Sequence, residues 1–132
     1  MQIMNKLLLS VMALFTGCLT SCGQQDIKSV DADEFEKTIS RDGVQLLDVR
    51  TETEFREGHI ASDKVKNIDV KQPGFIKQAG GELDKGRPVA VYCRSGRRSM
   101  DAARLLAKRG FEVINLKGGI LEWQEKGKPI RR

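Results

Sequence analysis

Short apolar runs alternate with helical patterns along most of the chain. Residues 44–49, 88–92 and 111–116 are apolar and rich in β-forming side chains. Such runs predict strands that are buried on both faces, as in a parallel sheet. A fourth strand is predicted over 65–70, where interspersed lysines favour the edge of the sheet.

Helical patterns fall between these strands, and two of them begin at capping signals. Asp31 is followed by Glu34, and Thr51 by Glu54, the spacing of a capping box. The first signal predicts a helix to about Ser40, and the second a short helix that ends near Gly58. Three further helices are predicted: one opened by Pro73 and closed by Gly80-Gly81, one capped by Ser99 and ended by Gly110, and one from Gly118-Gly119 to Gly127.

Strands that alternate with helices predict an α/β fold with one central parallel sheet of about five strands and helices on both faces. The chain has 132 residues, which suits one compact domain, placed here at 26–132. In such folds ligands bind at the carboxyl ends of the strands. Cys93 follows the clearest strand directly, and we expect that strand to be central.

An apolar run over residues 7–19 follows Lys6 near the N-terminus. The run is too short to span a bilayer as a helix and is typical of a signal peptide. Residues 19–22, Leu-Thr-Ser-Cys, resemble the bacterial lipobox, in which the cysteine is lipidated and becomes the mature N-terminus. We therefore expect a lipoprotein signal peptide over 1–21, a lipidated Cys22 and a short tether over 22–25.

This leader implies an exported, periplasm-facing protein that is anchored by lipid to a bacterial membrane. Lipidation at Cys18 and an ordinary secretory signal are the alternatives. Loss of Cys18 with the leader and lipidation of Cys22 would leave Cys93 as the one free thiol of the mature protein. No disulfide framework could then form.

Charge and composition favour a small anionic ligand over a nucleic acid. The net charge is +5 and aromatic residues make up 5% of the chain. Nucleic-acid binders usually carry a basic stripe with stacking aromatics, whereas several arginines here crowd into one short segment.

That segment joins the strand at 88–92 to the next helix and reads Cys93-Arg94-Ser95-Gly96-Arg97-Arg98. Backbone N–H groups and the helix dipole at such a junction stabilise a thiolate, so Cys93 is a candidate nucleophile. Gly96 permits a positive φ in the turn, and neighbouring arginines call for an anionic ligand. A buried structural cysteine beside solvated arginines is the alternative, which the strand-end position disfavours.

At this point the sequence resembles the rhodanese-like domain family. Residues 46–50, Leu-Leu-Asp-Val-Arg, with Glu-Phe at 54–55 and Gly-His-Ile at 58–60, are similar to the start of these domains. Residues 91–99 are similar to their active-site loop, and 110–123 to their closing segment. The resemblance covers essentially all of 26–130, is closest to single-domain exported thiosulfate sulfurtransferases, and departs only in a longer link over 61–66.

The resemblance implies a two-step sulfur transfer. Cys93 would attack the outer sulfur of thiosulfate or a similar anionic donor and pass it, as a persulfide, to cyanide or a thiol. Backbone N–H groups from Arg94 through Arg98 would hold the persulfide, and Arg94 or Arg97 would bind the sulfonate. Arg98 would pack on the loop or pair with an acid. No cofactor and no metal are implied.

Three acidic and basic residues near the first strand, Asp48, Arg50 and Glu54, are interpreted as structural, in caps and salt bridges. A cysteine phosphatase or arsenate reductase is a rival function, but its loop is one residue longer than the segment from Cys93 to Arg98. A sulfur carrier or a redox module that docks a protein partner is another alternative.

Overall fold

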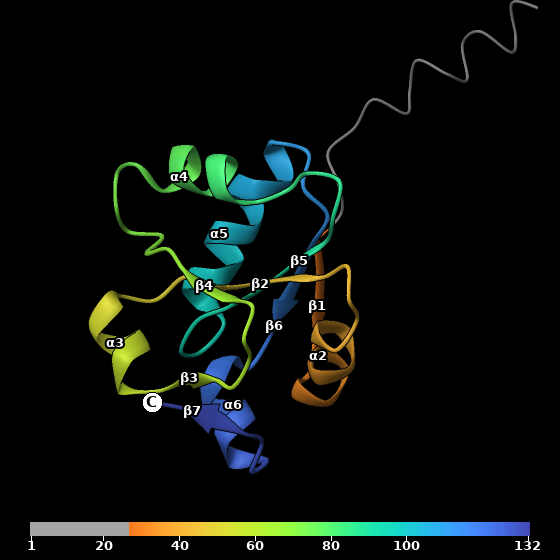
Figure 1. The fold of residues 1–132 in the computed structure, drawn as a ribbon, viewed down its shortest axis with the longest axis vertical. Coiled ribbons are helices and arrows are strands. Elements are labelled where there is room, and N and C mark those ends of the chain that lie inside the picture. Colours follow the sequence, from red (N-terminus) through yellow and green to blue (C-terminus); the bar gives the residue numbers. More distant parts are fainter. Residues whose placement is uncertain (1–26) are drawn as a thin grey trace, which may run out of the picture.

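The computed structural model describes residues 27–132, and a five-stranded sheet runs through its centre (Figure 1). The strand order is β1 (Ile27–Val30), β6 (Val113–Leu116), β5 (Val89–Tyr92), β2 (Gln45–Asp48) and β4 (Val65–Asn67). Every neighbouring pair is parallel. All five strands therefore end at one edge of the sheet, and the strand before Cys93 is central, as predicted.

Helices cover both faces of this sheet. The apolar residues of α4 (Phe75–Glu82) and α5 (Arg97–Lys108) pack in one core cluster, and those of α2 (Ala32–Ile39) and α6 (Gly119–Glu125) pack in the other. α3 (Glu52–Glu57) follows β2 and has no buried residue. The predicted two-faced α/β architecture is confirmed.

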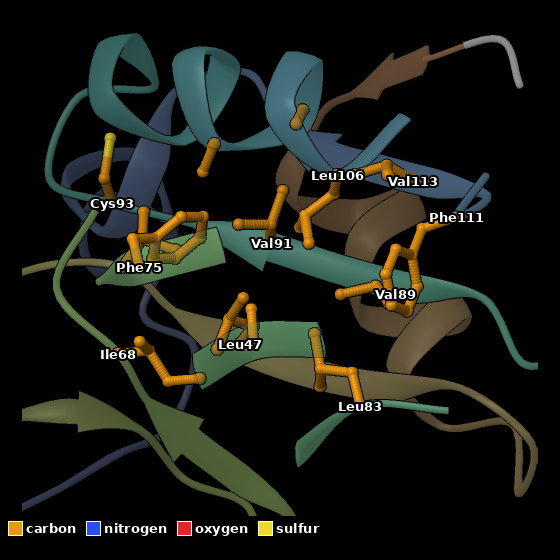
Figure 2. Close-up of a cluster of buried hydrophobic side chains, with 14 residues drawn as sticks. Leu47, Ile68, Phe75, Leu83, Val89, Val91, Cys93, Leu106, Phe111 and Val113 are labelled. Carbon is orange, nitrogen blue, oxygen red and sulfur yellow. The ribbon is translucent and has the colours of Figure 1, made fainter. Parts of the chain in front are cut away.

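Side chains of β5 enter the two cores alternately, because successive strand residues point to opposite faces. Val89, Val91 and Cys93 belong to the core under α4 and α5, as Figure 2 shows, whereas Ala90 and Tyr92 belong to the core on the other face. Cys93 therefore lies on the α5 side of the sheet.

The two predicted capping signals begin helices as expected. The Asp31 carboxylate accepts a hydrogen bond from the Glu34 N–H at 2.9 Å at the start of α2. At the start of α3, Thr51 and Glu54 form a complete capping box, and Gly58 follows the end of this helix. These signals act within one turn, which is why the sequence alone revealed them.

Two helix boundaries were predicted wrongly. Gly80 and Gly81 lie inside α4 rather than closing it, because burial of Phe75 and Ala79 outweighs the low helix propensity of two exposed glycines. Ser99 is not the N-cap of α5, which begins at Arg97 after Gly96, because the left-handed turn at Gly96 starts the helix earlier.

Some strands are shorter than predicted, and others were not predicted. The run at 65–70 forms a strand only over β4. β1 was not predicted, and it pairs with β6 at the edge of the sheet. A second, two-stranded antiparallel sheet joins β3 (His59–Ile60) to β7 (Ile130–Arg131), so the end of the chain is tied to the segment after α3.

The predicted signal peptide at 1–21, the lipidation site Cys22 and the tether at 22–25 lie outside the described residues. Within residues 27–132, the helices are all too short or too polar to cross a membrane.

A buried ion pair holds the carboxyl end of β2. The carboxylate of Asp48 is fully buried and accepts from the Arg50 guanidinium at 2.6 Å, while the same Nη2 donates to the Gly58 carbonyl at 2.7 Å. The Asn67 amide donates to the carbonyls of Asp48 and Arg50 at 3.0 and 2.9 Å. The predicted structural role of Asp48 and Arg50 agrees with this network, which joins β2, β4 and the end of α3.

Removal of the Asp48 charge would leave the Arg50 guanidinium buried without a counter-ion. We expect Asp48→Asn to lower the free energy of unfolding by on the order of 3 kcal/mol. Urea unfolding followed by the fluorescence of Trp123, the single tryptophan and a buried one, measures the loss. Asp42→Asn, at an exposed carboxylate, is the matched control, and an equal effect of the two variants would contradict this role.

Candidate active site

The Cys93 side chain lies between the end of β5 and the start of α5. Its Sγ accepts a hydrogen bond from the Gly96 N–H at 3.1 Å. Only 1% of the residue surface is exposed, so the sulfur is almost completely enclosed by the protein. The bond from Gly96 is of the kind that stabilises negative charge on sulfur.

The N-terminus of α5 points its positive end at this sulfur. Its N-cap residue, Gly96, has φ +98° and supplies no side chain, so no side chain caps the first-turn N–H groups. These groups have no partner inside a helix and form a site for an anion. Ser99, in the same turn, is fully buried, and its Oγ has no hydrogen-bond partner among residues 27–132.

The carbonyl groups of the loop are turned toward α6. The Ile120 N–H donates to the Cys93 carbonyl at 2.9 Å, and the Leu121 N–H donates to the Arg94 carbonyl at 3.2 Å. The first N–H groups of α6 are thereby satisfied, and α6 has no side-chain cap. With these carbonyls held by α6, the other side of the loop backbone is left for the sulfur and its substrates.

Two glycines permit this close approach. Gly96 has φ +98°, and a Cβ there would collide with the backbone carbonyl of Lys117. Gly119 has φ +64°, and a Cβ there would collide with the backbone carbonyl of Arg94. Both positions therefore require glycine for conformation and for space.

The three arginines of the loop are placed differently, a division that the sequence left open. Arg98 is half-buried and forms a two-pronged ion pair with Glu54, with Nη1–Oε1 and Nη2–Oε2 distances of 2.8 and 2.9 Å. The hydrogen bonds from Arg98 hold the pKa of the Glu54 carboxyl down to about 2. The same bonds raise the pKa of Arg98, and the nearby charges of Cys93 and Asp69 raise it further.

Arg94 and Arg97 are exposed, and neither forms an ion pair in the described part of the chain. Arg94 lines a hollow of about 210 Å³ together with Glu54, Leu121 and Gln124. Within residues 27–132, no carboxylate therefore neutralises either guanidinium group.

A larger hollow of about 700 Å³ opens at the same edge of the sheet. It lies among the segments after β2 and β4, and half of its lining residues are neutral and polar, including Thr51, Asn67, Gln72 and Gln78, with Asp69 among its acids. The negative charge of Asp69 raises the pKa of Arg98 at the end of the loop.

Of the predicted loop residues, Gly96 contacts the Cys93 sulfur, Arg98 pairs with Glu54, and Arg94, Ser95 and Arg97 are exposed. Sequence reasoning assigned Glu54 a structural role, but it did not name the partner of Arg98. It also missed the donors of α6 at Ile120 and Leu121. The Gly118-Gly119 pair was the sequence feature that could have indicated this close contact, but it was interpreted only as the start of a helix.

The known proteins that this chain resembles agree with the geometry. A model of the rhodanese-like domain matches residues 31–126. The Arabidopsis thaliana protein named thiosulfate sulfurtransferase 18 is 35% identical over 121 residues, which cover 84% of this chain and 88% of that protein. A protein of Allochromatium vinosum named sulfurtransferase is 32% identical and covers 79% of this chain and 94% of its own length.

A solved structure shows the same fold. The crystal structure of a rhodanese-related protein from Thermoplasma volcanium superposes with a TM-score of 0.68 at 29% identity, over 79% of this chain and 97% of that one. The family model covers well over half of the chain, and the relatives match along most of their own lengths. This chain therefore belongs to the rhodanese-like domain family.

Proposed function

We propose that this domain transfers sulfane sulfur from thiosulfate or a similar donor to a thiol or cyanide through a persulfide on Cys93. The observation that carries the proposal is the Cys93 sulfur itself, which accepts the Gly96 N–H at 3.1 Å at the N-terminus of α5, in a loop whose exposed Arg94 and Arg97 form no ion pair within residues 27–132. The names of its sulfurtransferase relatives support the same class of reaction.

The reaction proceeds in two displacements. The Cys93 thiolate attacks the outer sulfur of thiosulfate, the S–S bond of the donor breaks, and sulfite leaves with the bonding electron pair. Cyanide then attacks the outer sulfur of the persulfide, and thiocyanate leaves as the thiolate re-forms. The sulfur is carried on Cys93 itself, so the cycle calls for no cofactor and no net proton transfer.

Each part of the loop has a role in these steps. The negative charge of the persulfide is stabilised by the Gly96 N–H and the first turn of α5. Arg94 and Arg97 bind the sulfonate and stabilise the departing sulfite, because both are exposed and unpaired within residues 27–132. Arg98 is held by Glu54 and keeps the loop in place.

The geometry favours sulfur over phosphate as the transferred group. Only four residues separate Cys93 from Arg98, and the Arg98 guanidinium is occupied by Glu54. Because only 1% of the Cys93 surface is exposed, the site leaves less room for a bulky phosphate ester than for the single terminal sulfur of thiosulfate.

We also propose that the domain acts outside the cytoplasm, as a protein exported by its signal peptide and held to a bacterial membrane by lipid on Cys22. The support is the leader sequence and the lipobox-like residues 19–22. Mass spectrometry of the N-terminal peptide from native membranes tests this part separately.

Addition of thiosulfate should load one sulfur atom onto Cys93 of the wild-type protein, and cyanide should then release it as thiocyanate. Cys93→Ser should do neither, because an alcohol is not ionised and does not attack sulfane sulfur at neutral pH. Intact-protein mass spectrometry and a thiocyanate assay measure the two steps. Aryl phosphate hydrolysis by wild-type protein without persulfide would refute the proposal, and loading only from a partner protein would assign a carrier role instead.

Truncation of either free arginine should weaken binding of the donor. We expect Arg94→Ala and Arg97→Ala to lower kcat/KM for thiosulfate roughly tenfold or more, the size of one charge-assisted hydrogen bond. Arg104→Ala, which removes an exposed arginine of α5 that pairs with Asp101, is the control. If all three variants lowered kcat/KM equally, Arg94 and Arg97 would have no specific role in binding the donor.

Neutralisation of Glu54 should show how much its ion pair with Arg98 contributes to the free energy of unfolding. The folded pKa of Glu54 lies near 2, below the ordinary 4.5, so its contribution is complete above about pH 4.5 and is lost as the pH falls toward 2. We expect Glu54→Gln to cost about 1 kcal/mol of unfolding free energy near neutral pH and nothing below about pH 2.

Urea unfolding of wild-type protein and variant over a pH series measures this difference. Glu52→Gln serves as the control, because the Glu52–Arg56 pair is more than 70% exposed on both sides. A Glu54→Gln effect that is independent of pH, or no larger than that of Glu52→Gln, would be inconsistent with the proposed pair.

A further inference from the structure

The catalytic loop and the point where the chain enters the domain lie at opposite edges of the sheet. β1 begins at Ile27 and runs parallel to β6, which runs parallel to β5. The start of β1 is therefore at the amino-end edge, whereas Cys93 follows the carboxyl end of β5. Figure 2 shows Cys93 at one side of the view and the start of β1 at the other.

The predicted lipidation site is close to the amino-end edge along the chain. Cys22 and Ile27 are separated by five Cα–Cα steps, which span at most about 18 Å even when fully extended. A lipid on Cys22 would thus keep the amino-end edge within a short reach of the bilayer.

Positive charge gathers at this same edge. We define the basic edge as the first two residues of β1 and the segments 39–46, 61–66, 82–90 and 108–114, which lead into the other four strands. It holds eight Lys and Arg against five Asp and Glu. The eight cations are Lys28, Arg41, Lys64, Lys66, Lys85, Arg87, Lys108 and Arg109.

These cations are not neutralised by ion pairs. None of the eight forms a salt bridge within residues 27–132, whereas the Asp63 carboxylate of the same edge pairs with Arg131. Three of them donate instead to backbone carbonyls: Lys64 to Arg41 at 2.9 Å, Lys66 to Glu82 at 2.9 Å and Arg87 to Gly43 at 3.0 Å. A surface of this kind is attracted to anionic lipid headgroups.

We infer that the basic edge rests on the anionic headgroups of the membrane that holds Cys22, so that the Cys93 loop faces away from the bilayer. The sulfur donor and acceptor then reach Cys93 from the aqueous compartment. This orientation rests on the proposed lipidation of Cys22, but it is independent of the proposed sulfur transfer.

The test uses the full lipidated protein in vesicles that contain phosphatidylglycerol. In a Cys93→Ser background, a nitroxide is attached either at Asp42→Cys, on the basic edge, or at Gln72→Cys, after β4 at the carboxyl-end edge; both residues are exposed. Relaxation by nickel chelated to lipid headgroups reports how near each label lies to the membrane. We expect relaxation several-fold stronger at position 42 than at position 72.

The contribution of charge is tested in the same vesicles. Lys108→Glu with Arg109→Glu should shrink the difference between the labels, as should 1 M salt or vesicles of phosphatidylcholine alone. Lys71→Glu with Lys117→Glu, which reverses two exposed cations at the carboxyl-end edge, should leave the difference in place.

Equal relaxation of the two labels, or stronger relaxation at position 72, would overturn the inference. So would an N-terminal peptide that carries no lipid. Persulfide formation on wild-type protein in the same vesicles is measured separately, and its absence would reject the sulfur-transfer proposal without bearing on the orientation.

Discussion

The direction in which the catalytic loop faces depends on its backbone contact with α6. Two N–H groups of α6 bind the carbonyls of Cys93 and Arg94, and the glycines at 96 and 119 let the two segments approach closely enough to do so. With those carbonyls engaged, the N–H groups at the start of α5 are left for the sulfur. The last helix, far from Cys93 along the chain, is thus part of the site.

The different environments of Arg94, Arg97 and Arg98 follow from the position of one carboxylate, that of Glu54. All three lie within five residues, yet in the described part of the chain only Arg98 pairs with an acid, because α3 brings Glu54 to it. α3 in turn is held by its capping box and by the bond from Arg50 to Gly58 at its end. The buried pair after β2 and the half-buried pair at the loop therefore belong to one chain of contacts, whereas Arg94 and Arg97 form no ion pair within residues 27–132.

The parallel sheet also places the Cys93 loop and the entry point of the chain at opposite edges. Its carboxyl-end edge carries the loop around Cys93, and its amino-end edge receives the chain at Ile27 and carries the basic edge. The proposed lipid anchor and the proposed active site, placed in this way, would not compete for the same surface. A hydrophobic core on each face of the sheet keeps the two edges at a fixed separation.

The sequence by itself determined the α/β pattern, the caps at Asp31 and Thr51, and the position of Cys93 after a buried strand, because these signals act over a few residues. Only the tertiary structure decided the pairing of β1 with β6, the partner of Arg98 and the hydrogen bonds from α6 to the loop carbonyls. Each of these joins segments distant in the sequence, and packing of the two cores selects among partners that local patterns leave equivalent. The start of α5 also depends on the tertiary structure. The backbone carbonyl of Lys117, distant in the sequence, leaves no room for a Cβ at the N-cap position, so this position requires Gly96.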